Sequence, residues 1–310
     1  SHGSGSMGES WRRHHRALAE FILKYESKNI FEIGGGHGTL AREYIGKRTN
    51  ATWTILEANP TPSYFHDRIS FQKGIFDDSC VINNDIDTIV HSHLFEHIYS
   101  PVSFIKKLYD SLPNGGYTIF SVPFLEQQIK ENITYCLGFE HTIFLNETFI
   151  EFFLHQAGFK IIDKQIYQEN HSLFYCAQKK GDSCIDVSFP NKYDEYLELF
   201  KNYFQFNENK VADLNRLIKS SSEKVFLFGG HVASQYLISY GLNIECLESI
   251  LDNDPKKQGR RLYGTNLKVR SPQVLRNMGK VNVILRQGVF NKEIKEDILE
   301  QINNNVVFWE

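Results

Sequence analysis

Cysteine is scarce in this 310-residue chain, and the few cysteines present follow no recognisable spacing. All five lie far apart in the sequence, and no two of them form a Cys-x-x-Cys pair. An odd and scattered set of thiols supports neither a disulfide framework nor a cysteine-based zinc site. We therefore expect reduced, cytoplasmic surroundings and no metal site.

The sequence also lacks long apolar runs. No uninterrupted apolar stretch approaches the roughly 18 to 20 residues that are needed to cross a bilayer. Residues 1–6, before Met7, have the composition of an expression-vector remnant, and the segment that follows contains no apolar core of a signal peptide. We therefore expect no membrane partner.

Charge of neither sign is in excess. The chain has 34 lysines and arginines against 37 aspartates and glutamates, which gives a net charge of -3. This balance argues against a protein whose main task is to bind the nucleic-acid backbone. Because 41% of the residues are hydrophobic, the composition also argues against disorder. Composition gives no signal for the oligomeric state.

Short β-branched segments alternate with amphipathic segments in the first half of the chain, which predicts a doubly wound α/β sheet. Helices are predicted at 39–45 and 102–112, strands at 29–33, 52–57, 69–71, 88–91 and 117–122, and an edge hairpin at 160–167 and 173–177. A Gly-Asp-Ser stretch at 181–183 resembles a linker. One domain is therefore expected to end near residue 180.

A second α/β unit is predicted after the linker. Apolar residues at helical spacing over 193–218 indicate a long connecting helix. Strands are then expected at 224–228, 247–251, 281–285 and 306–309, with helices at 232–240 and after residue 291. The predicted division is a vector-derived and disordered start at 1–10, a first domain at 11–180, a connecting helix at 181–222 and a C-terminal domain at 223–310.

The most informative motif is a glycine-rich segment between the first predicted strand and helix. It contains Gly34, Gly36 and Gly38, and Glu32 precedes it by two positions. Small residues allow a tight turn and close approach to a ligand, and the following helix offers free amides. The last two glycines are two positions apart, whereas the dinucleotide fingerprint spaces them by three. A glycine turn without a ligand is the alternative interpretation.

Two further acidic residues end or follow predicted strands. Glu57 ends the second predicted strand, about 20 residues beyond the glycines, where a carboxylate can accept both hydroxyls of a ribose. Phe76 and Asp77 follow the third strand and can supply an apolar cover and an acceptor for an exocyclic amine. A solvated Glu57 at the strand end, and an Asp77 that caps a helix before Ser79, are the alternatives.

The Glu-x-Gly-x-Gly-x-Gly pattern resembles motif I of the class I methyltransferases that depend on S-adenosyl-L-methionine (SAM). Glu96-His97-Ile98 after the fourth strand, and Leu112-x-x-Gly115-Gly116 before the fifth, extend this resemblance in order from Glu32 to Val122. The resemblance implies a Rossmann-like SAM-binding methyltransferase domain at 11–180. It also implies SAM contacts from Glu32, Gly34, Gly36, Gly38, Glu57, Phe76, Asp77 and His93.

The rest of the chain resembles the sugar C-methyltransferases that act on nucleotide-linked deoxysugars. Residues 138–145 are similar to that family's substrate-framing segment, and Gly158-Phe159 is similar to the pair that opens its terminal hairpin. Residues 228–234 and 252–272 are similar to the glycine turn and the Asp-x-x-Pro-x-Lys-x-Gly signature of its C-terminal domain. The resemblance implies a second, smaller Rossmann-like domain and a small-molecule substrate, a nucleotide-sugar or a related precursor for polysaccharide biosynthesis.

The chain departs from that family where chemistry is concerned. The N-terminal zinc-binding module is absent, Phe139 and Phe144 replace a His and a Tyr, and residues 170–172 replace a Gly-Gly-Ser turn. Carbon methylation beside a ketone needs both a base and an oxyanion stabiliser, so loss of the Tyr favours oxygen methylation. Another small acceptor, such as a phosphorylated metabolite, or a non-catalytic protein that binds SAM or a nucleotide, is the alternative.

His141 is the first choice for the catalytic base, because a neutral imidazole can accept a hydroxyl proton near pH 7. Glu140 is expected to orient His141 or to accept a sugar hydroxyl. The alternates are His93, His97 and His171. A histidine that only caps the following helix is the alternative interpretation of His141. In the second domain, Gly229-Gly230 and a basic loop at 256–261 are compatible with a diphosphate or with a merely solvated loop.

Overall fold

The computed structural model describes residues 9–83, 85–134, 136–138, 140–181 and 188–310. The chain forms two compact units, one of residues 1–126 and 139–191 and the other of residues 127–138 and 192–310. The predicted vector remnant, most of the Gly-Asp-Ser linker and Phe139 lie outside the described residues. No helix in the described part of the chain combines the length and apolar character that a membrane crossing requires.

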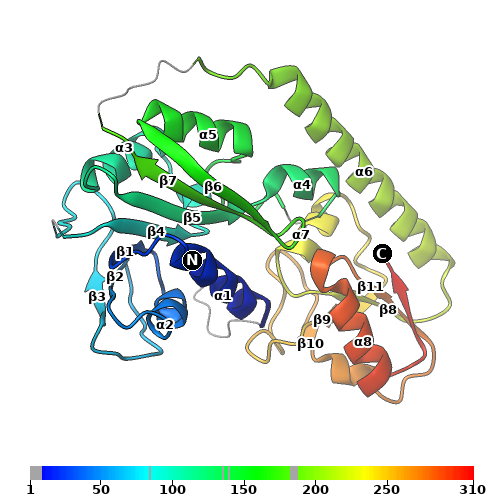
Figure 1. Cartoon of the computed structure of the whole chain (residues 1–310). Helices are drawn as coiled ribbons and strands as arrows, with labels where there is room; N and C mark the ends of the chain where they lie inside the picture. The colour runs from blue at the N-terminus through cyan, green and yellow to red at the C-terminus, as the bar shows by residue number, and fades with distance from the viewer. Residues whose placement is uncertain (1–8, 84, 135, 139, 182–187) are drawn as a thin grey trace. The chain divides into compact units, whose positions relative to one another are not determined.

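The first unit is built on a seven-stranded sheet with the order β3-β2-β1-β4-β5-β7-β6 (Figure 1). Its strands are β1 (Asn29–Ile33), β2 (Thr52–Glu57), β3 (Ile69–Lys73), β4 (Thr88–Ser92), β5 (Tyr117–Pro123), β6 (Phe159–Tyr167) and β7 (Ser172–Lys179). The first five run parallel, and β7 is antiparallel to both neighbours. Because β1 and β4 are adjacent, the chain reverses its strand order there, and ligands of such sheets bind at the carboxyl ends beside that point.

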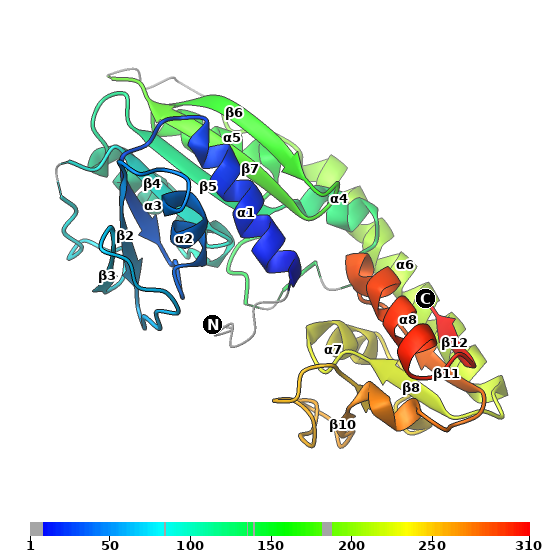
Figure 2. The same ribbon diagram turned by 60° about the horizontal axis from the view of Figure 1, so that its bottom comes forward.

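Helices cover both faces of this sheet (Figure 2). The helices α1 (Glu9–Leu23) and α2 (Thr39–Ile45) pack on one face, and α3 (Pro101–Ser111) and α5 (Glu147–Gln156) pack on the other. A short 3-10 helix, η1 (Phe95–His97), follows β4. Since both faces are covered, the central strands are almost continuously buried, as in β4, where Thr88 to His91 are all buried.

The helix α1 was not predicted, and the expected domain start at residue 11 falls inside it. Its apolar face buries Leu18, Phe21 and Ile22 in the same core as α2. His14 is also fully buried on this helix. Arginines and histidines crowd the first half of the segment, so its apolar periodicity becomes visible only after Ala17.

The second unit has a parallel five-stranded sheet with the order β10-β9-β8-β11-β12. Its strands are β8 (Val225–Phe228), β9 (Leu247–Leu251), β10 (Val269–Arg270), β11 (Val281–Ile284) and β12 (Val306–Trp309). Its longer helices are α6 (Tyr193–Ser220), α7 (Val232–Ser239) and α8 (Asn291–Gln301). The two-residue strand β10 was not predicted, because so short an element leaves no period in the sequence.

Residues 127–138, which include most of α4 (Leu125–Lys130), belong to the second unit. The buried Tyr203 of α6 donates its hydroxyl to the carbonyl oxygens of Ile133 and Thr134, both at 3.1 Å. Arg286 donates from Nε to the Thr134 hydroxyl at 3.1 Å. The helix α6 itself lies in the second unit, where Val211, Leu214 and Ile218 pack in the core, whereas the sequence predicted a separate connecting helix.

Candidate functional site

The glycine-rich turn leaves β1 and enters α2 at the carboxyl edge of the first sheet. Gly36 has a φ of 53°, in the left-handed region that favours glycine. A Cβ atom placed on Gly36 would meet no atom within 4 Å. The turn therefore presents its backbone to open space at this position.

Glu57 lies beside this turn, as its place in the sequence predicted. The amide of Gly36 donates to Glu57 Oε2 at 3.1 Å, and the amide of Asn59 donates to Oε1 at 3.2 Å. The parallel pairing of β1 with β2 brings the two segments together. A carboxylate has about four acceptor positions, so this half-buried group can accept further hydrogen bonds.

Glu32 lies beneath the turn. Only 2% of Glu32 is exposed, and the indole Nε1 of Trp53 donates to its Oε2 at 2.8 Å. A Cβ atom on Gly35 would lie 2.6 Å from Glu32 Cδ and 2.8 Å from Ile55 Cγ2. Close packing therefore also requires a glycine at position 35, which the motif did not single out. Burial raises the pKa of Glu32 to about 7.

Asp77 forms a local turn. Its Oδ1 accepts from the Ser79 amide at 2.9 Å and from the Ser79 hydroxyl at 2.6 Å, and these bonds lower the pKa of Asp77. Residues 78–83 form no helix, so the helix-cap alternative for Asp77 is wrong, and Oδ1 instead closes a local turn with Ser79. The neighbouring Phe76 packs its ring 5.7 Å from that of Phe104, while Ile75 is 69% exposed.

His93 follows β4 directly and has a left-handed φ of 47°. Its Nδ1 lies 3.3 Å from Glu96 Oε1, and its Nε2 lies 2.9 Å from the Ser172 hydroxyl. The next residue, Leu94, approaches Gly34, since a Cβ there would lie 3.5 Å from Leu94 Cδ1. His93 therefore precedes a residue that approaches the glycine turn, at the point where the strand order reverses.

His141 is brought to the same edge by a loop that docks on η1. The amides of Thr142 and Ile143 donate to the carbonyl oxygen of Glu96 at 2.9 and 3.3 Å. The rings of His141 and His97 lie 5.1 Å apart. One ligand atom from each of Glu96, His97 and His141 lies within 4.8 Å of the other two.

His141 does not cap the helix that follows it. The cap of α5 is Asn146, whose side chain accepts from the Phe149 amide. Burial lowers the pKa of His141, so the imidazole is neutral near pH 7. The expected partner, Glu140, is exposed, and its carbonyl oxygen accepts from His97 Nδ1 at 3.0 Å.

Glu96 is the carboxylate that sequence reasoning missed. Only 3% of Glu96 is exposed, and it lies between His93 and the pair formed by His97 and His141. Burial alone would raise the pKa of Glu96, but the hydrogen bond and the charge of His93 outweigh burial and lower it. His171 joins His93 on the other side, across the buried Ser172.

The second unit contains a similar connection between a glycine turn and an acid. The Gly230 amide donates to Oδ2 of the buried Asp252 at 2.7 Å, as the Gly36 amide does to Glu57. Here, however, Lys257 also donates to Asp252 Oδ2, at 3.1 Å. The Gly230 amide and Lys257 therefore already donate to Asp252 and are not both available to a phosphate. This disfavours the predicted diphosphate site.

Comparison with known families decides the class of the protein. Residues 9–164 match the family model described as a methyltransferase domain, which spans half of the chain. The chain belongs to this methyltransferase family. Residues 190–308 of the methyltransferase match a second model, described as a C-methyltransferase C-terminal domain. The predicted Rossmann-like fold and methyl-transfer activity are confirmed.

Several solved structures are similar to the methyltransferase. One is a chain of a complex that joins the Haloferax volcanii Trm112 methyltransferase activator to a protein assigned as a methyltransferase. It is 13% identical with a TM-score of 0.46, and the match covers 56% of this chain and 93% of that one. Human N-acetylserotonin methyltransferase in complex with SAM is 18% identical (TM-score 0.45), over 56% of this chain and 53% of its own. A Listeria monocytogenes protein assigned as a SAM-dependent methyltransferase is 14% identical (TM-score 0.41), over 53% and 99%. No curated protein matches the chain.

The buried Glu32 predicts a pH-dependent stability. Burial raises its pKa from an ordinary 4.5 to about 7, so between these values the folded chain holds a proton that the unfolded chain has released. Its contribution to stability therefore falls as the pH rises through this window. Glu32→Gln keeps an acceptor for Trp53 and removes the titration. We expect its stability relative to wild type to rise by up to about 3 kcal/mol between pH 4.5 and pH 8.

Urea unfolding of both proteins across this pH range measures the effect. Parallel stability curves for wild type and variant would contradict a protonated Glu32 beneath the turn.

Proposed function

We propose that SAM binds at the turn formed by residues 34–38 and that Glu57 accepts the hydroxyls of its ribose. The observation that supports this is the bond from the Gly36 amide to Glu57, next to the open space at Gly36. Glu32, beneath the turn, fixes the backbone rather than contacting the ligand directly. Gly34 and Gly38 are the first and last residues of this turn and belong to the proposed SAM site.

The adenine is proposed to lie on the segment that follows β3. The exposed Ile75 and the half-buried Phe76 offer apolar surface there. Only Oδ1 of Asp77 accepts the two hydrogen bonds from Ser79. Its other carboxylate oxygen, Oδ2, can accept a hydrogen bond from an amine. His93, beside the turn, is proposed to lie near the methyl-bearing end of the cofactor.

His141 is proposed as the base that removes a hydroxyl proton from the acceptor. When bound, SAM supplies an electrophilic methyl group and is released as S-adenosylhomocysteine. The neutral His141 ring takes the proton as the acceptor oxygen forms its bond to carbon, and the nearby Glu96 carboxylate stabilises the resulting imidazolium. Holding the acceptor in line supplies most of the remaining rate enhancement.

The proposed acceptor is a hydroxyl of a nucleotide-activated sugar or a related glycan precursor. The resemblance of residues 138–159 and of the second unit to enzymes of nucleotide-linked deoxysugars supports this substrate class. Oxygen methylation is favoured because Phe144, which replaces the family's Tyr, offers no hydroxyl to stabilise an enolate. Another small acceptor, such as a phosphorylated metabolite, is the alternative outcome of the substrate test.

A second candidate, carbon methylation of the same class of substrate, is favoured by one observation. Residues 190–308 match the C-methyltransferase C-terminal domain. Glu96, His97 and His141 together offer a base and a further proton donor. The two candidates therefore differ in the atom that receives the methyl group and not in the location of the site.

A panel of nucleotide-sugars tests the proposal directly. Each is incubated with the protein and SAM carrying a carbon-13 methyl group, and S-adenosylhomocysteine release is measured. We expect turnover with one sugar nucleotide and a product signal in the range of methoxy carbons. A signal in the range of methyl groups on carbon would establish the second candidate, and turnover only with simple phosphorylated metabolites would overturn the substrate class.

Gly36→Val is expected to abolish binding of S-adenosylhomocysteine, because the side chain fills the space beside the turn and strains a left-handed residue. The matched control is Gly241→Val in the second unit, where φ is 94° and a Cβ also meets no atom within 4 Å. Calorimetric titration should show wild-type affinity for the control alone. Wild-type affinity in Gly36→Val would contradict the site.

His141→Ala is expected to lower turnover by about 100-fold or more while leaving the affinity for S-adenosylhomocysteine unchanged, since a lost general base has this effect. The matched control is His155→Ala, which removes a half-buried histidine of α5. Unchanged turnover in His141→Ala would assign the base to another residue. Parallel losses of turnover in both variants would indicate a folding effect.

A further inference from the structure

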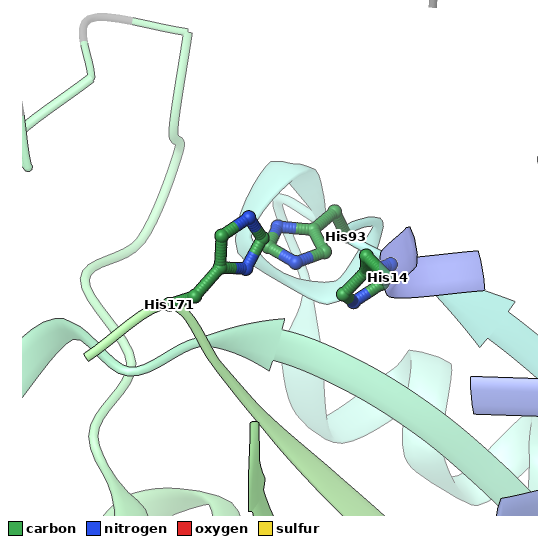
Figure 3. A group of neighbouring side chains, drawn as sticks. All are labelled: His14, His93 and His171. Carbon is green, nitrogen blue, oxygen red and sulfur yellow. The ribbon is translucent and has the colours of Figure 1, made fainter. Parts of the chain in front are cut away.

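Three histidines from distant segments converge at the edge of the first unit. His14 comes from α1, His93 follows β4, and His171 lies in the turn between β6 and β7 (Figure 3). Their ring centroids are 5.2 Å (His14 and His93), 5.4 Å (His14 and His171) and 6.0 Å (His93 and His171) apart. One ring nitrogen from each lies within 4.8 Å of the other two.

His14 is a buried imidazole without a partner. It is 0% exposed, and neither of its ring nitrogens has a hydrogen-bond partner among the described residues. Its ring neighbours include Tyr167 and Phe174, both 5.3 Å away between centroids. Buried polar atoms are normally paired, so an unpaired imidazole inside a histidine cluster indicates a missing ligand.

His93 has the environment of a metal-binding histidine. Its Nδ1 lies 3.3 Å from the Glu96 carboxylate, and its Nε2 is directed at the Ser172 hydroxyl, 2.9 Å away. His171 Nδ1 lies 2.6 Å from the same hydroxyl. Metal-bound histidines commonly donate their second ring nitrogen to a carboxylate, which orients the ring. The rings of His93 and His171 thus both approach the Ser172 hydroxyl, and the carboxylate of Glu96 orients His93.

We propose that His14, His93 and His171 bind one divalent transition-metal ion of the zinc class. Imidazole nitrogens suit zinc, copper, iron and nickel, and three of them leave a fourth position open. Glu96 orients His93 from outside, and Ser172 lies next to the ion. The cysteine pattern gave no metal expectation because it covers only thiolate sites, and His14 belonged to no predicted helix.

The ion adds a group that the proposed methyl transfer does not require. His93 precedes Leu94, which approaches Gly34, so one of the three ligands is next in sequence to a residue at the turn where SAM is proposed to bind. A metal there can hold a water or an oxygen of the acceptor. The site stands on the geometry of the three histidines and is independent of the identity of the acceptor.

Titration of the chelator-treated full chain with zinc chloride, followed by cobalt chloride in a separate sample, tests the site. We expect one zinc ion per chain by calorimetry and a visible absorption band with cobalt. Trp11, whose ring lies 4.9 Å from His93 and 5.4 Å from His171, should be quenched by cobalt. Trp11→Phe should remove most of this quenching and keep the ion.

The variants His171→Ala and His93→Asn test the ligands, and Asn tolerates the left-handed backbone of residue 93. Both should lose the ion. Glu96→Gln should lower the affinity for zinc about 10-fold to 100-fold. The control His155→Ala should bind zinc with wild-type affinity. Circular dichroism and thermal unfolding, measured on each variant, show whether it is folded. No stoichiometric zinc in the wild type, or an ion retained by folded His171→Ala and His93→Asn, would overturn the proposal. If only His97→Ala lost the ion, the ion would belong to the group of Glu96, His97 and His141. That result would also overturn the proposal.

Discussion

The bond from the Gly36 amide to the Glu57 carboxylate is the contact on which the site depends. It joins the turn after β1 to the end of β2, and so fixes both the open backbone and the acceptor beside it. Glu32 supports the same turn from below through Trp53, and Gly35 allows the close approach. The buried carboxyl of Glu32 and the half-buried carboxylate of Glu57 therefore have different tasks at one turn.

The second unit uses the same connection without leaving an acceptor free. Asp252 accepts from the Gly230 amide and from Lys257, so its charge is compensated inside the unit. The glycine turns of the two units can therefore differ in function although each donates an amide to an acidic side chain. In the first unit the acid has no such lysine among the described contacts of its carboxylate, and the turn faces open space.

Much of the fold could be predicted from the sequence, because local patterns carry it. The helix Thr39–Ile45 and the strand Thr52–Glu57 have the predicted bounds, since a buried parallel strand and a glycine turn both leave clear local signals. The helix α1 was missed where basic residues interrupt the apolar pattern. Glu96 and His14 were missed because only tertiary folding brings η1 and α1 to the other histidines.

The assignment of the glycine turn as the SAM site is the central claim. Calorimetric titration of S-adenosylhomocysteine into wild type and Glu57→Ala tests it most directly, because Glu57 provides the acceptor and also holds Gly36. The account predicts one molecule bound per wild-type chain and an affinity at least about tenfold lower in the variant, as expected when charge-assisted hydrogen bonds are removed. Equal affinity in the two proteins, with both folded, would contradict it.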